Sequence, residues 1–332
     1  MSDFRIDKIT NRDGSAGTQI AGISTFSGTS GMQLPAGPTE YRGGRGRGLF
    51  GSGANPSAIN VIDMIEIATK GNSTDFGDDN LVRQEGYAAF ASPTRGVFGG
   101  GYISPGVNTK DIAYVTISSQ GGVSDFGNLD VAQSRNVGLS DSTRGISAGG
   151  AEPTNGRISY VTIASTGDST DYGDLTVARY GSGACASPTR GLIAGGNPNT
   201  NIIDYITIQT KGNAETFGNL SDDPNHLAGC SNSTRGLFGG GQNPSNVDVI
   251  AYVTIATLGN AIDFGNLNNA VDYLGACASA TRGVFGGGKT SVYINVIEYV
   301  TIANTGNATD FGDLTVNRRF CMGLSDVHGG LG

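Results

Sequence analysis

The sequence predicts an all-β fold, a six-bladed β-propeller of four-stranded blades, on three observations. The chain has 55 glycines in 332 residues, and glycine costs about 1 kcal/mol relative to alanine inside a helix. Many of the other residues are Val, Ile, Thr, Tyr and Phe, which suit pleated sheets. An internal repeat of 45 to 49 residues favours one continuous structure over two ordinary domains.

The repeat is marked by the triplet Thr-Arg-Gly, preceded by one degenerate copy. Its arginines lie 48, 49, 46, 45 and 47 residues apart: Arg47, Arg95, Arg144, Arg190, Arg235 and Arg282. Six copies predict six structural units.

Each copy contains four candidate strands. The strand that starts at the arginine is followed by a variable loop, an alternating apolar segment such as 252–256, and an Asp-Phe-Gly segment such as 263–267. A small-residue segment such as 183–187 then leads to the next triplet. Four strands at a spacing of about ten residues match one propeller blade. A β-helix needs shorter coils, and helical repeats need apolar stripes that are absent here.

The phase of the repeat predicts how the ring closes. Residues 318–326 match 135–141, a first strand, but no further copy follows them, whereas the copy at Arg47 has no first strand of its own. We expect the two ends to complete one blade, which removes the exposed sheet edges. The predicted domains are an N-terminal anchoring arm, 1–45, and a propeller, 46–332, whose first blade is completed by residues 318–327.

The net charge, the apolar segments and the cysteine positions restrict what the chain can bind and which covalent bonds it can form. A net charge of −8 and a pI near 4.7 disfavour nucleic acid despite Arg42, Arg45 and Arg47. The start has no apolar leader and no 18-residue apolar run occurs, so we expect neither a cleaved signal nor membrane insertion. Three cysteines share one repeat position and are interpreted as small core residues without disulfides: Cys185, Cys230 and Cys277.

The repeated charged residues are interpreted as structural, because a ligand site usually breaks repeat symmetry. We expect the arginines of the triplet to pair with the aspartates of Asp-(Phe/Tyr)-Gly and tie strand ends together. The residues concerned are Arg95, Arg144, Arg190, Arg235, Arg282, Asp125, Asp171, Asp263 and Asp310.

No motif indicates catalysis, and we expect a non-enzymatic protein without cofactor or metal. Propeller oxidases need several His and Tyr ligands, but the chain has only His226 and His328, and it lacks the Trp of sialidase boxes. Zinc and EF-hand strings are absent. Loop calcium at 78–79 or 222–223, where two aspartates are adjacent, stays open.

The connections after the second strands vary most: 52–60, 102–111, 151–157, 197–201, 242–248 and 289–295. We expect them on one face with the links from fourth to first strands. Their polar and aromatic residues suit sugar binding, although unconstrained surface loops explain the variation equally well. The candidate ligand residues are Tyr102, Arg157, Asn197, Asn243, Lys289 and Tyr293.

The units resemble kelch-type propeller repeats, with an arginine before the first strand (Arg135, Arg179, Arg318) and a Gly-Gly pair ending the second. The late Trp of kelch units is absent, so this resemblance concerns architecture only.

The chain as a whole is similar to the Gly-rich repeat proteins of marine tailed bacteriophages. Matching segments are Thr-Arg-Gly-Val-Phe-Gly-Gly-Gly, Tyr-Val-Thr-Ile-Ala and, outside the repeat, residues 26–37. The resemblance implies a virion structural protein of a tail, fibre or surface appendage, which the arm would attach to other virion proteins.

A host-recognition adhesin that binds surface glycan through the variable loops is the alternative. A cellular kelch-like scaffold or a hydrolase ranks last, and homo-oligomerisation is left open.

Overall fold

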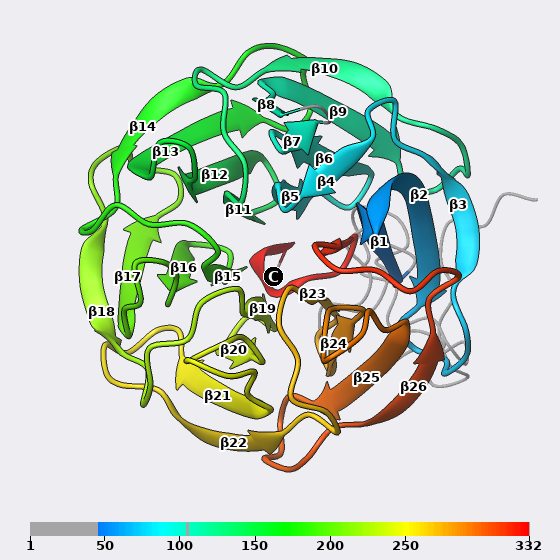
Figure 1. Cartoon of the computed structure of the whole chain (residues 1–332). Helices are drawn as coiled ribbons and strands as arrows, with labels where there is room; N and C mark the ends of the chain where they lie inside the picture. Colours follow the sequence, from blue (N-terminus) through cyan, green and yellow to red (C-terminus); the bar gives the residue numbers. More distant parts are fainter. Residues whose placement is uncertain (1–45, 104–105, 332) are drawn as a thin grey trace, which may run out of the picture. The chain divides into compact units, whose positions relative to one another are not determined.

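The computed structural model describes residues 46–103 and 106–331 (Figure 1). The chain divides into two units, Met1–Tyr41 and Arg42–Gly332. The predicted arm, 1–45, lies outside the described residues. The described part of the second unit contains 27 strands and one short 3-10 helix, η1 (Gly329–Leu331). The predicted all-β class is therefore confirmed.

Four kinds of strand recur from the centre outward (Figure 1). The small-residue segments form the innermost strands: β27 (Met322–Ser325), β5 (Ala88–Ala91), β11 (Val137–Ser140), β15 (Gly183–Ala186), β19 (Ala228–Ser231) and β23 (Gly275–Ala278). The repeated arginines begin the second strands: β1 (Arg47–Asn55), β6 (Arg95–Gly99), β12 (Arg144–Gly150), β16 (Arg190–Ala194), β20 (Arg235–Gly239) and β24 (Arg282–Gly286).

The alternating apolar segments form the third strands: β2 (Ser57–Glu66), β9 (Asp111–Thr116), β13 (Asn155–Thr162), β17 (Ile202–Thr207), β21 (Val249–Thr254) and β25 (Val296–Thr301). The Asp-Phe-Gly segments and their variants form the outermost strands: β3 (Thr74–Asp78), β10 (Ser124–Asn128), β14 (Thr170–Asp174), β18 (Glu215–Asn219), β22 (Ile262–Asn266) and β26 (Thr309–Asp313).

These strands build six four-stranded antiparallel sheets in a propeller-like arrangement (Figure 1). We number them in chain order: sheet 1 (β27, β1, β2, β3), sheet 2 (β5, β6, β9, β10), sheet 3 (β11–β14), sheet 4 (β15–β18), sheet 5 (β19–β22) and sheet 6 (β23–β26). In sheet 1 the C-terminal β27 pairs with β1, placing Leu324 opposite Leu49. The predicted pairing of the two ends of the repeat array is confirmed.

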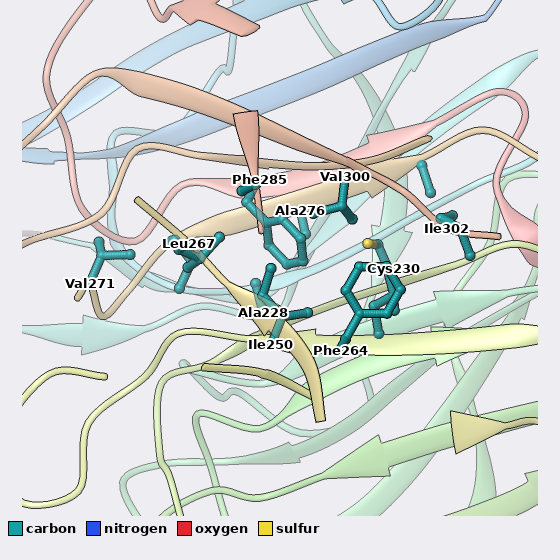
Figure 2. Packing of buried hydrophobic residues seen from close by; sticks show 14 residues of the cluster. Ala228, Cys230, Ile250, Phe264, Leu267, Val271, Ala276, Phe285, Val300 and Ile302 are labelled. Atoms are coloured by element: carbon teal, nitrogen blue, oxygen red, sulfur yellow. The ribbon is translucent and has the colours of Figure 1, made fainter. Parts of the chain in front are cut away.

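Apolar clusters lie between neighbouring sheets. Figure 2 shows the cluster of sheets 5 and 6, in which Phe264 of sheet 5 and Phe285 of sheet 6 are both 2% exposed. Six such clusters occur among the described residues, and one joins sheet 6 to sheet 1 through Val284, Ile297 and Phe50. The apolar core is thus divided among all successive pairs of sheets.

The innermost strands contain small residues because they approach one another at backbone distance. A Cβ added to Gly138 would lie 2.4 Å from the Ala89 carbonyl oxygen, and one added to Gly323 would lie 2.2 Å from that of Ala276. All four cysteines are buried and free, which confirms the prediction made for Cys185, Cys230 and Cys277. Burial raises the pKa of the Cys230 thiol to about 12, which keeps it protonated.

The repeated arginines join neighbouring sheets. The Arg95 Nη1 atom donates to the Ile163 carbonyl of sheet 3 at 3.0 Å, and Arg282 donates to the Ile67 carbonyl of sheet 1 at 2.8 Å. Equivalent bonds leave the other four sheets, so the series returns to its start. In sheets 2 to 6 the guanidinium also lies 4.4 to 4.9 Å from the ring centre of a third-strand tyrosine.

The expected Arg–Asp pairing is therefore wrong. The aspartates Asp125, Asp171, Asp263 and Asp310 are exposed, and no ion pair among the described residues links them to the repeated arginines. The reason is local: the stacking tyrosine directs the guanidinium to a carbonyl of the next sheet. The buried member of Asp-Phe-Gly is the aromatic residue, 1 to 3% exposed in every sheet.

The outermost strands are also bonded to the following sheet. The N–H of Gly121 donates to the Phe76 carbonyl at 2.9 Å, and equivalent bonds continue around to Gly71, which donates to Phe311 at 2.9 Å. At this contact a Cβ on Gly312, whose φ is 152°, would lie 2.4 Å from the Gly71 oxygen. These bonds satisfy backbone groups that an outer edge would otherwise expose.

Buried ion pairs fix the approach to the innermost strands. Arg179 lies 3.1 Å from Asp204, and Arg318 lies 2.5 Å from Asp63, with all four side chains 0% exposed. Arg135, which the kelch-like pattern groups with Arg179 and Arg318, lies two residues further along its link and pairs with Glu85 instead.

Some connections differ from the prediction. Three further strands form a small sheet beside sheet 2: β4 (Arg83–Glu85), β7 (Tyr102–Ile103) and β8 (Val107–Asn108). The segment 52–60, predicted as a loop, is mostly strand, because β1 and β2 continue past the sheet to a tight turn with Ala54 opposite Ala58.

Candidate functional site

One face of the unit is formed where the links to innermost strands meet the connections after second strands; we call it the loop face. Backbone bridges join the two kinds of segment in five sheets: Ser134–Ala151, Tyr180–Asn197, Asn225–Gln242, Asp272–Lys289 and Arg319–Ala54. The predicted sharing of one face is therefore confirmed.

At the centre of the loop face, six residues follow one another, one from each link; we call them the axial ring. Its members are Gly86, Arg135, Gly181, His226, Tyr273 and Phe320. From Arg135 onward, each backbone N–H donates to the carbonyl of the preceding member at 2.5 to 3.0 Å. A continuous line of hydrogen bonds thus fixes the ring.

The backbone of the axial ring is unusual for the side chains it carries. Arg135, His226, Tyr273 and Phe320 have φ between 53° and 59°, in the left-handed region that disfavours large residues at a cost of about 1–3 kcal/mol each. Such positions persist only where the surrounding structure holds them, and they cluster at functional sites. The axial ring is therefore the first candidate for a binding function.

Three aromatic members of the ring pack closely against one another in tilted arrangements. The ring centres of His226 and Tyr273 are 4.1 Å apart, and those of Tyr273 and Phe320 are 4.2 Å apart. Position 181 is glycine because a Cβ there would lie 2.7 Å from His226 Cδ2. The aromatic side chains of the axial ring therefore lie together on one side of it.

Two members of the axial ring, Arg135 and His226, have basic side chains. Arg135 makes two contacts with the Glu85 carboxylate, at 2.7 and 2.8 Å. Burial, and then the nearby Arg135 and Arg319, lower the pKa of His226 to about 3. His226 is thus neutral at neutral pH.

Asp272 lies beneath the loop face and is 3% exposed. Burial raises the pKa of its carboxyl to about 6, and this is opposed by the charge of Lys289. Arg319, which forms the backbone bridge to Ala54, is a second cation that acts on Asp272. Its guanidinium carbon lies 4.9 Å from the Phe320 ring centre.

The axis beneath the ring is narrow. Cavities of about 30, 30 and 50 Å³ follow one another between the innermost strands, with shared lining residues such as Leu227, Ala89 and Gly138. Each has room for a few waters. A larger ligand would therefore bind on the loop face.

The opposite end of the axis is covered by the C-terminal tail, in which η1 lies at the centre of Figure 1. His328 is half-buried and bonds through Nε2 to the Ala91 carbonyl at 2.9 Å and to Ser140 Oγ at 3.2 Å. A Cβ on Gly330 would lie 1.8 Å from the Ser140 carbonyl oxygen. Only a chain without side chains fits this close to the innermost strands.

Four of the six predicted ligand residues border the axial ring or the links beside it. Lys289 bridges Asp272, and Tyr293 lies 5.5 Å from the guanidinium carbon of Arg319. Tyr102 pairs with Glu85 across the small sheet, and Asn197 bridges Tyr180.

The other two are engaged elsewhere. Arg157 is held by Asp130, with Asp171 at 3.6 Å. The Asn243 side chain donates to the carboxylates of Asp222 and Asp223. Their side chains therefore tie the connections of sheets 3 and 5 to the links that leave sheets 2 and 4.

The acidic pairs considered for calcium have protein partners. Asp79 contacts Arg83 at 3.2 Å and accepts from Ser52 at 3.1 Å. Asp222 and Asp223 share Asn243. Across the described ranges, no group of three His, Cys, Asp or Glu side chains is arranged to hold a metal ion.

Sequence reasoning missed the axial ring and Arg319. The available signal was the second residue before each small-residue strand, where one repeat position is occupied by Gly, Arg, His, Tyr and Phe in different copies. The predicted ligand residues came only from the variable connections after the second strands, so this variation within the links was not used.

Comparison with known proteins gives no relative: no protein-family model and no curated protein matches the chain. Within residues 46–103 and 106–331, no helix has the length and apolar character needed to cross a membrane.

Proposed function

We propose that the second unit is a closed six-bladed β-propeller and that it serves as a non-enzymatic structural component of a tailed-phage virion. The observation that carries the closed form is the cycle of arginine–carbonyl bonds, in which Arg282 of sheet 6 donates to Ile67 of sheet 1. The pairing of β27 with β1 and the apolar cluster between sheets 6 and 1 support the same form.

The structural role rests on how the molecule uses its charged groups. The repeated arginines join sheets, and the buried Arg179 and Arg318 are neutralised within the fold. Most of the charged groups that recur in the repeat therefore hold its sheets together. The virion assignment rests on the similarity of the repeat segments to Gly-rich phage proteins.

Purified particles test the virion assignment. Mass spectrometry should find the chain at a fixed copy number, and cross-links should join residues 1–45 to other virion proteins while the loop face stays accessible to labelling. Absence from washed particles, or cross-links from the loop face alone, would contradict the proposal.

A second function, glycan binding through the loop face, is favoured by the aromatic cluster at the axis. Tyr273 and Tyr293 are half-buried and lie beside cationic side chains, a combination that suits stacking on sugar rings and hydrogen bonding to hydroxyls. A glycan array read with the wild type and with Tyr273→Ala and Tyr293→Ala tests it. Equal signals from all three proteins would exclude this site.

A further inference from the structure

Arg319 differs from the other arginines near the axis in lacking an acidic partner. Arg318 beside it is neutralised by Asp63, and Arg135 across the ring by Glu85. No ion pair or side-chain hydrogen bond of Arg319 occurs among the described residues, and its buried Nε has no partner. The charge of Arg319 acts on Asp272 from a distance, but its guanidinium N–H groups have no carboxylate bonded to them.

The position of the Arg319 side chain is nevertheless fixed. Its backbone is bonded in both directions to Ala54, at 3.0 and 3.2 Å. Three aromatic rings surround the guanidinium, with centre distances of 4.9 Å for Phe320, 5.5 Å for Tyr293 and 5.8 Å for Tyr273. Aromatic packing takes the faces of a guanidinium and leaves the N–H groups at its edge, which match a carboxylate.

We propose that Arg319, with the rings of Tyr273 and Tyr293, forms a subsite for a carboxylate-bearing sugar unit, such as a uronic acid of a surface polysaccharide. This inference rests on glycan binding by the loop face and specifies its ligand. Tyrosine rings offer stacking surfaces to a sugar, while the guanidinium edge binds its carboxylate. Lys289, which bridges the adjacent Asp272, adds positive charge to this part of the face.

The charge of the whole chain makes the subsite selective. A net charge of −8 opposes polyanions in general, so an acidic glycan binds only where local cations and stacking outweigh that repulsion. The axial cavity of about 30 Å³ is too small for a sugar ring. The sugar would therefore lie over the ring, with its carboxylate toward Arg319.

The test is calorimetric titration of the full chain with trigalacturonic acid and with its neutral methyl ester. We expect the acid to bind more tightly than the ester, and Arg319→Gln to weaken binding of the acid by roughly tenfold or more. Arg319→Lys should fall between the two, because lysine keeps the charge but loses the planar pair of donors. Arg157→Gln is the matched control, since this loop-face arginine is already held by Asp130.

The outcomes separate this inference from the function it rests on. Equal binding of acid and ester, or unchanged binding by a folded Arg319→Gln, overturns the carboxylate subsite while glycan binding stands. Failure of the wild type to bind either sugar, together with a blank glycan array, removes both. Binding of oligoglutamate as tight as that of trigalacturonic acid overturns the assignment to a sugar.

Discussion

Deletion of residues 318–332 should unfold the propeller unit. The deletion removes Arg318 and leaves Asp63 buried without its cation, which costs about 3–5 kcal/mol. It also removes Leu324 and Phe320, each 4 to 5% exposed, at about 1.5–3 kcal/mol apiece. The sum, roughly 6–11 kcal/mol, is comparable to the whole stability of a typical domain, about 5–15 kcal/mol.

The assay is thermal unfolding followed by circular dichroism, with size-exclusion chromatography to detect aggregates from the exposed edge of β1. A shorter deletion, 327–332, removes η1 but keeps β27 and the Arg318 pair, so it should lower the melting temperature by a smaller amount. Removal of residues 1–40, which precede the first described strand, is the control and should leave the melt unchanged. A monomeric 318–332 deletion that melts like the full chain would refute closure by β27.

Three further perturbations test the interactions inside the unit. Asp204→Ala should destabilise the fold by about 3–5 kcal/mol because it leaves Arg179 buried and unpaired. Adding Arg179→Met should recover most of this loss in a double-mutant cycle measured by urea unfolding. If stability is not recovered, the ion pair is not the cause of the loss. Gly138→Ala should cost about 1–3 kcal/mol, since its Cβ would meet a backbone carbonyl at 2.4 Å, whereas Gly156→Ala, with 3.4 Å of room, should change little; equal melts would contradict the close packing. Burial lowers the pKa of His328 below its unfolded value of 6.5. Its contribution to stability is therefore complete above pH 6.5 and is lost as pH falls. His328→Gln should make the melting temperature depend less on pH between pH 7 and 5, and an unchanged dependence would refute this.

The order of the strands was predictable because each copy of the repeat has the same succession of apolar and small-residue segments. Alternating Val and Ile segments pair as third strands, and segments of Gly, Ala, Ser and Cys are small enough for the centre. The end-to-end pairing followed from the phase alone, since residues 318–326 look like a first strand. Nothing in this reasoning required a relative of known structure.

The partners of the charged residues were not predictable by the same means. Recurrence predicted a structural role for Arg95 and Asp125, but it did not indicate which atoms they contact. Arg95 stacks on Tyr114, and its Nη1 reaches a carbonyl of the next sheet 68 residues away. A backbone acceptor has no side-chain signature, so pairing by opposite charge chose the wrong partner.

The candidate site lies where the repeat holds the backbone constant and leaves the side chain free. The axial-ring positions follow one another through backbone hydrogen bonds, which any residue can make once the neighbouring strands fix its φ. Glycine would occupy the five left-handed positions of the ring with the least strain, yet only Gly181 is glycine. Arg135, His226, Tyr273 and Phe320 retain large side chains at an estimated 1–3 kcal/mol each. Packing between sheets does not require an aromatic cluster at the mouth of a narrow axis, so the strain retained at these positions supports our proposal that the loop face binds a ligand.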